Sequence, residues 1–243
     1  TEQRYEEILK LVEQKKSVTV AEICELFRIS ESTARRDINA LDQAGRLVRV
    51  FGGAVASDLN FESREPTVEQ KMDRNIEEKR QIAVYAAALI EPSDFVYLDA
   101  GTTTASMLSF LTEKSAIFVT NAVAHAKTLA AAGFRVYLVG GELKGSTEAV
   151  VGNQALMNLQ SYHFTKGFFG TNGISRQSGL TTPDMNEAMV KKTAMGQCKE
   201  CFILADHSKF GNVSSVTFGA FQSGTILTDT CPEEYKSSGN VVI

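Results

Sequence analysis

From Ile76 to Ile243, short apolar runs alternate with segments of helical pattern, and this alternation restricts the fold more than any other feature of the sequence. The apolar runs are FVYLDA, AIFVTN, RVYLVGGE, FTKGFFGTNG, CFILAD and TILTD. Strands that are apolar throughout are buried on both faces, and helices between them supply the crossover connections of a parallel sheet. The pattern therefore predicts a Rossmann-like α/β domain over residues 76–243.

Residues 1–56 have a different pattern, which predicts a small helical unit. Apolar residues at helical spacing indicate helices over residues 4–15 and 21–27, with a short extended piece at residues 18–20 between them. Ile29 is an apolar plug in the turn that follows the second helix.

A third helix and a β-hairpin complete this unit. Ser30 is a suitable N-cap, Ala34, Ile38 and Leu41 share one face of the helix, and Gly45 ends it. RLVRVFGGA then reads as a strand and a glycine-rich turn. Helix, turn, helix and wing together predict a winged helix-turn-helix.

Arginine is concentrated in this unit although the chain has a formal net charge of −4. From Arg28 to Phe51 there are five arginines and three acidic residues, and an arginine pair by itself fits a solvated, salt-bridged surface equally well. The spacing, the plug and the wing favour DNA, because a helix fits the major groove and its first turns meet base edges. The residues expected at the DNA are Ser30, Glu31, Ser32, Thr33, Arg35, Arg36, Arg46 and Arg49.

Residues 57–75 are polar, contain Pro66 and show no periodicity, so we interpret them as a linker. Lys71 and Lys79 are eight residues apart and would share a face if both were on one helix. Their place at the end of the linker would couple a ligand to the hinge between the domains. Surface lysines beside a helix are the plainer interpretation.

The loop after the first strand of the second domain is rich in hydrogen-bond donors. Asp99 is followed by Ala100, Gly101 and three threonines, at the point where a strand enters a helix. Free amides at a helix start favour an anion, and ligands of open α/β sheets bind at the carboxyl ends of the strands. A simple helix cap is the alternative. The predicted ligand contacts in this loop are Asp99, Gly101, Thr102, Thr103 and Thr104.

Other strand ends carry polar side chains that suit a phosphorylated sugar. Amides and carboxylates bind sugar hydroxyls, and lysines bind phosphate. The candidates are Asn121, Gly141, Glu142, Asn172, Asp206 and Lys209 at or just after strand ends, and Lys191 on the helix after GLTTPD.

The stretch ESTARRDINALDQAGRLVRVFGGA resembles the N-terminal signature of the DeoR family of bacterial sugar-metabolism repressors. YLDAGTTT, VTN, GGE, GTNGIS, GLTTPD and ADHSKFG also occur in that family in this order, so the resemblance covers nearly the whole chain. Two positions depart from the signature. Ala34 replaces the usual Ile or Val, which would loosen the packing behind the helix, and Phe51 replaces a common His on the wing.

The resemblance implies a sensor domain similar to ribose-5-phosphate isomerase, a phosphorylated sugar as effector, and no cofactor or metal. It implies that Lys71, Lys79, Asp206 and Lys209 respond to the inducer. The motifs are most similar to the fructose-operon repressors of Gram-positive bacteria, with fructose 1-phosphate as effector. RVYLVGGELKGSTEAVVG also resembles the lactose-operon repressors that answer to tagatose 6-phosphate. An oligomer, at least a dimer, would place the winged helices on repeated operator half-sites.

Two other functional classes are compatible with this fold. A sugar-phosphate isomerase or deaminase with a DNA-binding head would need acid–base groups, yet only His207 of the three histidines is near a strand end, and Glu142 and Glu187 form no evident carboxylate pair. A DNA-binding protein without a ligand would have no use for the donor-rich loop. We therefore expect a non-enzymatic repressor.

The remaining features favour a cytoplasmic protein. No apolar run approaches the roughly 20 residues of a membrane span, and the charged N-terminus is not a signal peptide. Cys198 and Cys201 form a single C-x-x-C without a nearby ligand histidine, so we expect reduced, structural thiols and no metal.

Overall fold

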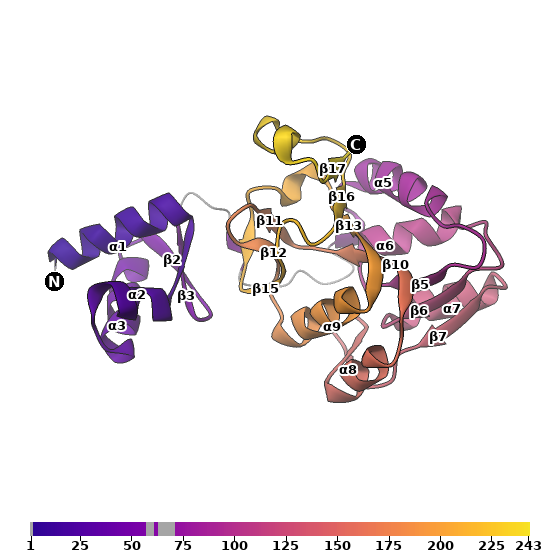
Figure 1. The fold of residues 1–243 in the computed structure, drawn as a ribbon, viewed down its shortest axis with the longest axis horizontal. Coiled ribbons are helices and arrows are strands. Elements are labelled where there is room, and N and C mark those ends of the chain that lie inside the picture. Colours follow the sequence, from indigo (N-terminus) through magenta and orange to yellow (C-terminus); the bar gives the residue numbers. More distant parts are fainter. Residues whose placement is uncertain (1, 57–60, 63–70) are drawn as a thin grey trace.

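The computed structural model describes residues 2–56, 61–62 and 71–243 (Figure 1). Its N-terminal unit is a winged helix-turn-helix, as predicted. The elements are α1 (Glu2–Lys15), α2 (Val20–Phe27) and α3 (Glu31–Gln43), with strands β1 (Ser17–Thr19), β2 (Leu47–Val50) and β3 (Gly53–Ala56). The strands form an antiparallel sheet in the order β1-β3-β2.

Side-chain caps fix where α2 and α3 begin. Thr19 and Glu22 form a capping box at the start of α2, in which each side chain bonds to the other residue's backbone amide. Ser30 caps α3 by accepting a hydrogen bond from the Thr33 amide at 3.3 Å. Ala34 is fully buried against the apolar core of this unit, so the small residue lies at the centre of the packing behind α3.

The second domain is built on a parallel sheet, which has seven strands among the described residues. In spatial order they are β17 (Val241–Val242), β16 (Thr225–Leu227), β13 (Cys198–Leu204), β10 (Phe164–Gly170), β5 (Phe95–Leu98), β6 (Ile117–Thr120) and β7 (Arg135–Leu138). Every pairing between these strands is parallel. The chain winds from β5 toward β7 and later from β10 toward β17, so the direction of winding reverses between β5 and β10. Such a reversal opens a crevice at the carboxyl ends of the two strands.

Helices cover both faces of this sheet, as Figure 1 shows. The helices are α5 (Ile76–Ala88), α6 (Thr102–Met107), α7 (Val123–Ala131), α8 (Asn153–Gln160) and α9 (Met185–Gly196). Apolar residues of α5, α6 and α7 form one core with the sheet, and those of α8 and α9 form a second core on the other side. Phe168 and Phe169 are adjacent on β10 and are fully buried in opposite cores, which explains why the strand is apolar throughout.

The sequence did not indicate several smaller antiparallel pairings. β11 (Gly173–Ser175), β12 (Gly179–Thr182) and β15 (Val216–Gly219) form a sheet beside α9, and β8 (Glu142–Lys144) pairs with β9 (Ala149–Val151). The GLTTPD motif therefore lies mainly in a strand. These strands are only three or four residues long and several begin or end with glycine, so they lack the continuous apolar pattern of the main sheet.

Part of the predicted linker belongs to the second domain. β4 (Phe61–Glu62) pairs in parallel with β14 (Val213–Ser214). Residues 57–60 and 63–70, including Pro66, lie outside the described residues. Within the described parts of the chain, no helix is long and apolar enough to cross a membrane.

Candidate DNA-binding surface and effector site

The two neighbouring arginines of α3 differ in their surroundings. Arg35 donates to the Glu31 carboxylate at 2.5 Å, one turn earlier on the helix. Arg36 is exposed and has no hydrogen bond or ion pair to any described residue. Arg36 is thus the cation of this pair that can bind a phosphate or a guanine edge without first breaking another contact.

A buried carboxylate fixes the orientation of α3. Asp37, which follows Arg36, is 2% exposed, and its Oδ2 accepts from Nε of Arg4 on α1 at 2.6 Å. Since Asp37 points into the unit, Arg36 must leave the helix in another direction. Within the motif ARRD (residues 34–37), Asp37 therefore fixes α3 to α1, and Arg36 is the cation exposed to solvent.

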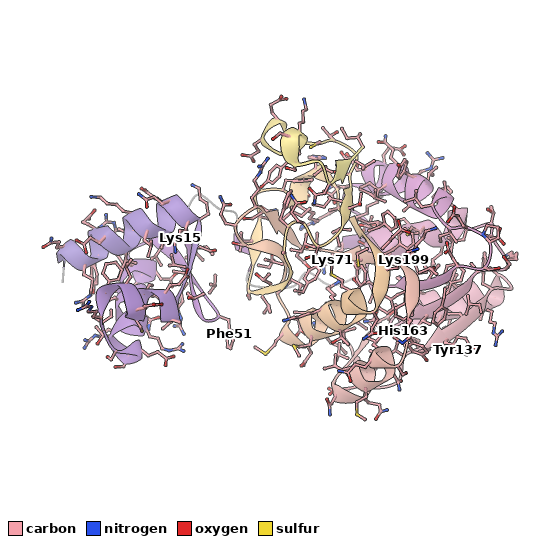
Figure 2. All side chains as sticks on the ribbon, viewed as in Figure 1. Lys15, Phe51, Lys71, Tyr137, His163 and Lys199 are labelled. Carbon is pink, nitrogen blue, oxygen red and sulfur yellow. The ribbon has the colours of Figure 1, made fainter. Side chains whose placement is uncertain are left out.

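The wing presents an aromatic residue at its tip. Phe51 is 73% exposed, and Figure 2 shows it projecting from the β2–β3 turn. The turn is held against α2, because the Val20 amide donates to the Gly52 carbonyl at 2.7 Å. Gly53 has to be glycine, since a Cβ there would lie 2.0 Å from the Val18 carbonyl oxygen. Arg49 is exposed beside this tip, and Arg46 pairs with Glu6 at 2.8 Å.

A cavity of about 340 Å³ lies at the crevice between β5 and β10. Its walls come from the loop after β5, the loop after β10, the segment after β13, helix α9, and the chain just before and within α5. The described lining residues are Lys71, Arg74, Asn75, Lys79, Ala100, Gly101, Thr102, Thr103, Gly170, Thr171, Asn172, Glu187, Lys191, Asp206, Ser208, Lys209 and Asn212.

Cations outnumber acids in this lining. Among the described residues, five are cationic (Lys71, Arg74, Lys79, Lys191 and Lys209) and two are acidic (Glu187 and Asp206). Glu187 is already paired, with Lys144 at 2.9 Å, and it accepts from the Thr147 hydroxyl at 2.5 Å. The cavity therefore favours an anion that also carries hydroxyl groups.

A buried ion pair supports the floor of the cavity. Lys191 on α9 contacts the Asp99 carboxylate and donates to the Gly170 carbonyl at 3.1 Å. Asp99 is 2% exposed and also accepts from the Gly170 amide at 3.0 Å, so it links the ends of β5 and β10. Burial raises the pKa of the Asp99 carboxyl, and Lys191 opposes that shift.

The residues of the loop after β5 have two different roles. Gly101, Thr102 and Thr103 line the cavity, and no side chain caps α6, so the first amides of this helix are available to a ligand. The Thr104 hydroxyl donates inward to the carbonyl of Asp99 at 2.7 Å and is fully buried. Thr104 therefore shapes the loop from behind.

Asn121 also acts from behind the loop. Its Oδ1 accepts from the Ala100 amide and from the Tyr97 hydroxyl, both at 3.0 Å, and its Nδ2 donates to the Val150 carbonyl at 3.2 Å. The side chain is 2% exposed and does not line the cavity. It joins three segments that sequence reasoning could not place together.

The cavity includes the end of the predicted linker. Lys79 is buried at the start of α5, and its Nζ donates to the Lys71 carbonyl. The expectation that both lysines share a face of one helix is wrong, because α5 begins at Ile76. They meet through a turn of the chain. Burial lowers the pKa of Lys79, and the nearby Asp206 opposes this shift.

Gly141 and Glu142 are not brought to the cavity. They follow β7, two strands away from β5, and the chain there turns into the β8–β9 hairpin. Gly141 has φ +149, and a Cβ at that position would lie 2.6 Å from the Val151 carbonyl oxygen. The glycine pair is thus explained by a close backbone approach.

Sequence reasoning missed several lining residues, among them Arg74, Asn75, Ser208 and Asn212. Arg74 and Asn75 lie in the segment interpreted as linker, where no periodic pattern marks them. Ser208 lies two residues after the predicted contact Asp206, and this proximity was the one usable signal.

The histidines do not supply acid–base groups to the cavity. His125 is buried, and burial lowers its pKa to about 4, so it is neutral near pH 7. His207 bonds to Asp229 through Nδ1 at 2.8 Å, which raises the pKa of the imidazole and holds the ring outside the described lining. His163 is exposed and is also absent from that lining.

The single C-x-x-C pair lies where expected, at the start of β13. Cys198 begins the strand, and the Cys198 and Cys201 thiols donate to carbonyls at the end of α9. No group of three or more potential metal ligands occurs within residues 2–56, 61–62 and 71–243.

A winged helix-turn-helix joined to an α/β domain with a cationic cavity defines the class of ligand-responsive DNA-binding regulators. Residues 4–59 match the DeoR-like helix-turn-helix domain, and residues 74–230 match the DeoR C terminal sensor domain. The chain belongs to the DeoR family of transcriptional regulators.

Curated relatives match over nearly their full length. The chain is 40% identical to FruR, an uncharacterized HTH-type transcriptional regulator of Bacillus subtilis, over 96% of this chain and 92% of the relative. It is 33% identical to the lactose phosphotransferase system repressor of Streptococcus mutans, over 97% and 94%. These relatives are regulators of transcription.

Ribose 5-phosphate isomerase A of Methanocaldococcus jannaschii is a distant structural neighbour. It is 15% identical, with a TM-score of 0.41, and the match covers 56% of this chain and 55% of that one.

Proposed function

We propose that this protein represses a fructose-utilisation operon and that fructose 1-phosphate, bound in the cavity at the end of β5 and β10, releases it from its operator. The observation that carries this proposal is the lining of the cavity. Its excess of cations suits a phosphate, and its amide, hydroxyl and carboxylate groups suit the hydroxyls of a sugar.

The phosphate and the sugar ring would occupy different parts of the cavity. Lys209 and the Gly101–Thr103 loop supply a cation and free amides for the phosphate. Asn172 and Asp206 supply an amide and a carboxylate for the hydroxyls. Lys191 also lines the cavity, but its ammonium group is paired with Asp99. Its main role would therefore be to hold together the loops that follow β5 and β10.

The DNA-binding half of the proposal rests on α3 and the wing. Arg36 would read or contact the DNA from the first turns of α3, with Ser30, Glu31, Ser32, Thr33 and Arg35 around it. Arg46 and Arg49 would contact phosphates or the minor groove from the wing. An oligomer of at least two copies would present two such units to repeated half-sites.

A second candidate effector is tagatose 6-phosphate, acting at a lactose operon. It is favoured by the 33–35% identity to lactose phosphotransferase system repressors over almost the whole chain. The two sugars differ in hydroxyl orientation and phosphate position. The same cavity would bind either one, and the choice between them depends on the hydroxyl partners.

The experiment that tests the proposal measures operator release. An operator is selected from a random-sequence duplex pool with the full-length protein. Its dissociation constant is then measured by fluorescence anisotropy with fructose 1-phosphate, fructose 6-phosphate, tagatose 6-phosphate, fructose or inorganic phosphate. We expect fructose 1-phosphate to weaken operator binding at the lowest concentration. The repressor model is wrong if no phosphosugar changes operator affinity.

A pair of variants locates the effector site. Lys209→Gln removes a cavity cation, whereas Lys199→Gln removes an exposed cation outside the described lining (Figure 2). A hydrogen bond to a charged group contributes about 1.5–3 kcal/mol, so Lys209→Gln should weaken fructose 1-phosphate binding by roughly tenfold or more. Isothermal titration calorimetry measures the effect, and equal affinities for the two variants would place the effector elsewhere.

A further inference from the structure

Asn75 precedes α5 but does not act as an ordinary helix cap. Asparagine at this position normally has an extended backbone, and its side chain accepts a hydrogen bond from an amide in the first turn. Here the backbone is left-handed, with φ 50 and ψ 48, and the side chain makes no capping hydrogen bond. Asparagine tolerates this conformation better than most residues, yet the conformation is still disfavoured.

The side chain of Asn75 is bonded to the cavity instead. Its Nδ2 donates to Oδ1 of Asp206 at 2.9 Å and lies 3.3 Å from the Ser208 hydroxyl. Asp206 is 1% exposed and sits at the end of β13. The bond therefore joins the segment just before α5 to the carboxyl edge of the sheet, across 131 residues of sequence.

Within the described residues, the hydrogen bonds to the Asp206 carboxylate converge on one oxygen. Oδ1 accepts from Asn75, from the Ser208 amide at 3.0 Å and from the Ser208 hydroxyl. Asp206, Ser208 and Asn75 all line the cavity. A ligand hydroxyl that donates to this same Oδ1 would therefore compete directly with the Asn75 amide.

Residues 71–75 connect the cavity to the DNA-binding unit. Lys71 and Arg74 line the same cavity as Asn75, and the chain before Lys71 leads back to the winged helix. The Lys71 carbonyl is in turn held by Nζ of Lys79. A change at Asn75 would thus reach the short segment of residues 71–75. This segment is bonded to Asp206 through Asn75 and to Lys79 through the Lys71 carbonyl.

We propose that the hydrogen bond between Asn75 and Asp206 is a latch that holds the DNA-binding form, and that a ligand hydroxyl opens it by taking Oδ1 of Asp206 as its acceptor in place of Asn75. This inference rests on the proposed function for the identity of the ligand, but not for the existence of the latch. Once released, Asn75 can leave the left-handed conformation and cap α5, which gives the open form a compensating hydrogen bond.

Two variants of Asn75 test the latch in the full-length protein. Asn75→Gly removes the amide while accepting the left-handed backbone, so the fold is retained. Asn75→Asp keeps the size of the side chain and places a carboxylate against Asp206. The control is Asn153→Gly, at the exposed first residue of α8, whose side chain has no hydrogen bond within the described chain. Thermal unfolding checks that all variants fold.

Operator affinity without any ligand is the decisive measurement. The latch predicts that Asn75→Gly and Asn75→Asp bind the selected operator at least about fivefold more weakly than the wild type, the lower end of common allosteric couplings. It also predicts that fructose 1-phosphate weakens their operator binding by a smaller factor than it does in the wild type. Asn153→Gly should behave as wild type in both respects.

The possible outcomes distinguish a failure of the latch from a failure of the proposed effector. If ligand-free Asn75→Gly binds the operator as tightly as the wild type, the latch is wrong. If no phosphosugar changes wild-type operator affinity but Asn75→Gly is still weakened, the latch stands and the proposed effector fails. If the wild type responds to fructose 1-phosphate and Asn75→Gly responds by the same factor, the effector stands and the latch is overturned.

Discussion

Neighbouring residues of the same type have different roles in this protein. Arg35 and Arg36 are indistinguishable in the sequence, yet Arg35 is paired with Glu31 and Arg36 has no partner among the described residues. Thr103 and Thr104 differ in the same way, since Thr103 lines the cavity and Thr104 is buried behind it. The role of each of these residues therefore depends on the direction in which its side chain points from the backbone.

The arginine pair gives a prediction about operator binding. Arg36→Gln should weaken it by roughly tenfold or more, because a well-placed arginine contact with a base contributes about 1–3 kcal/mol. Arg35→Gln should cost less, since Arg35 must first give up its Glu31 pair. Fluorescence anisotropy measures both, with Lys127→Gln on exposed α7 as the control. A larger loss from Arg35→Gln would contradict this assignment.

Elements are positioned by buried polar side chains that join strand ends. Asp99 links the ends of β5 and β10, and Asn121 links the loop after β5 with the end of β6 and with β9. These contacts explain the defined shape of the donor-rich loop. They also make stability and effector binding depend on the same residues.

The effect of Asn121 on stability is measurable. Asn121→Ala leaves the Tyr97 hydroxyl and the Ala100 amide without their acceptor. Each of these two unsatisfied groups costs about 1–3 kcal/mol, so the free energy of unfolding should fall by roughly 2–6 kcal/mol. Urea denaturation of the variant beside Asn153→Ala measures the difference. A loss below about 1 kcal/mol would mean that Asn121 does not support the loop.

The whole molecule combines a DNA-reading unit with a sensor whose cavity includes Lys71, Arg74 and Asn75 from the chain between them. Binding at one site can change affinity at the other only if the two states differ in their contacts, and the coupling acts equally in both directions. Operator DNA should therefore weaken effector binding by the same factor by which effector weakens operator binding.

An oligomeric repressor predicts a strict geometry of its operator. Two winged helices held by one assembly require half-sites about one helical turn, or roughly 10–10.5 base pairs, apart, or a multiple of that distance. Inserting about 5 base pairs between the half-sites should abolish tight binding, whereas inserting about 10 should restore most of it. Gel-shift titration of the three duplexes measures this, and indifference to spacing would indicate independent monomers.

Local features of the sequence were sufficient for the helices, the main strands and the family. Apolar periodicity placed the helices and main strands, Ser30 marked the start of α3, and the arginines and threonine loop indicated DNA and anion chemistry. Such signals are readable because burial and capping act over a few residues.

The tertiary structure alone decided the strand order, the partners of the buried polar groups, and the inclusion of Arg74, Asn75 and Ser208 in the cavity. Glu142 is a second example of this limit, because it follows β7, which packing places two strands away from β5 and the crevice. The physical reason is that these contacts join residues far apart in the chain, where local periodicity carries no information about which ends meet.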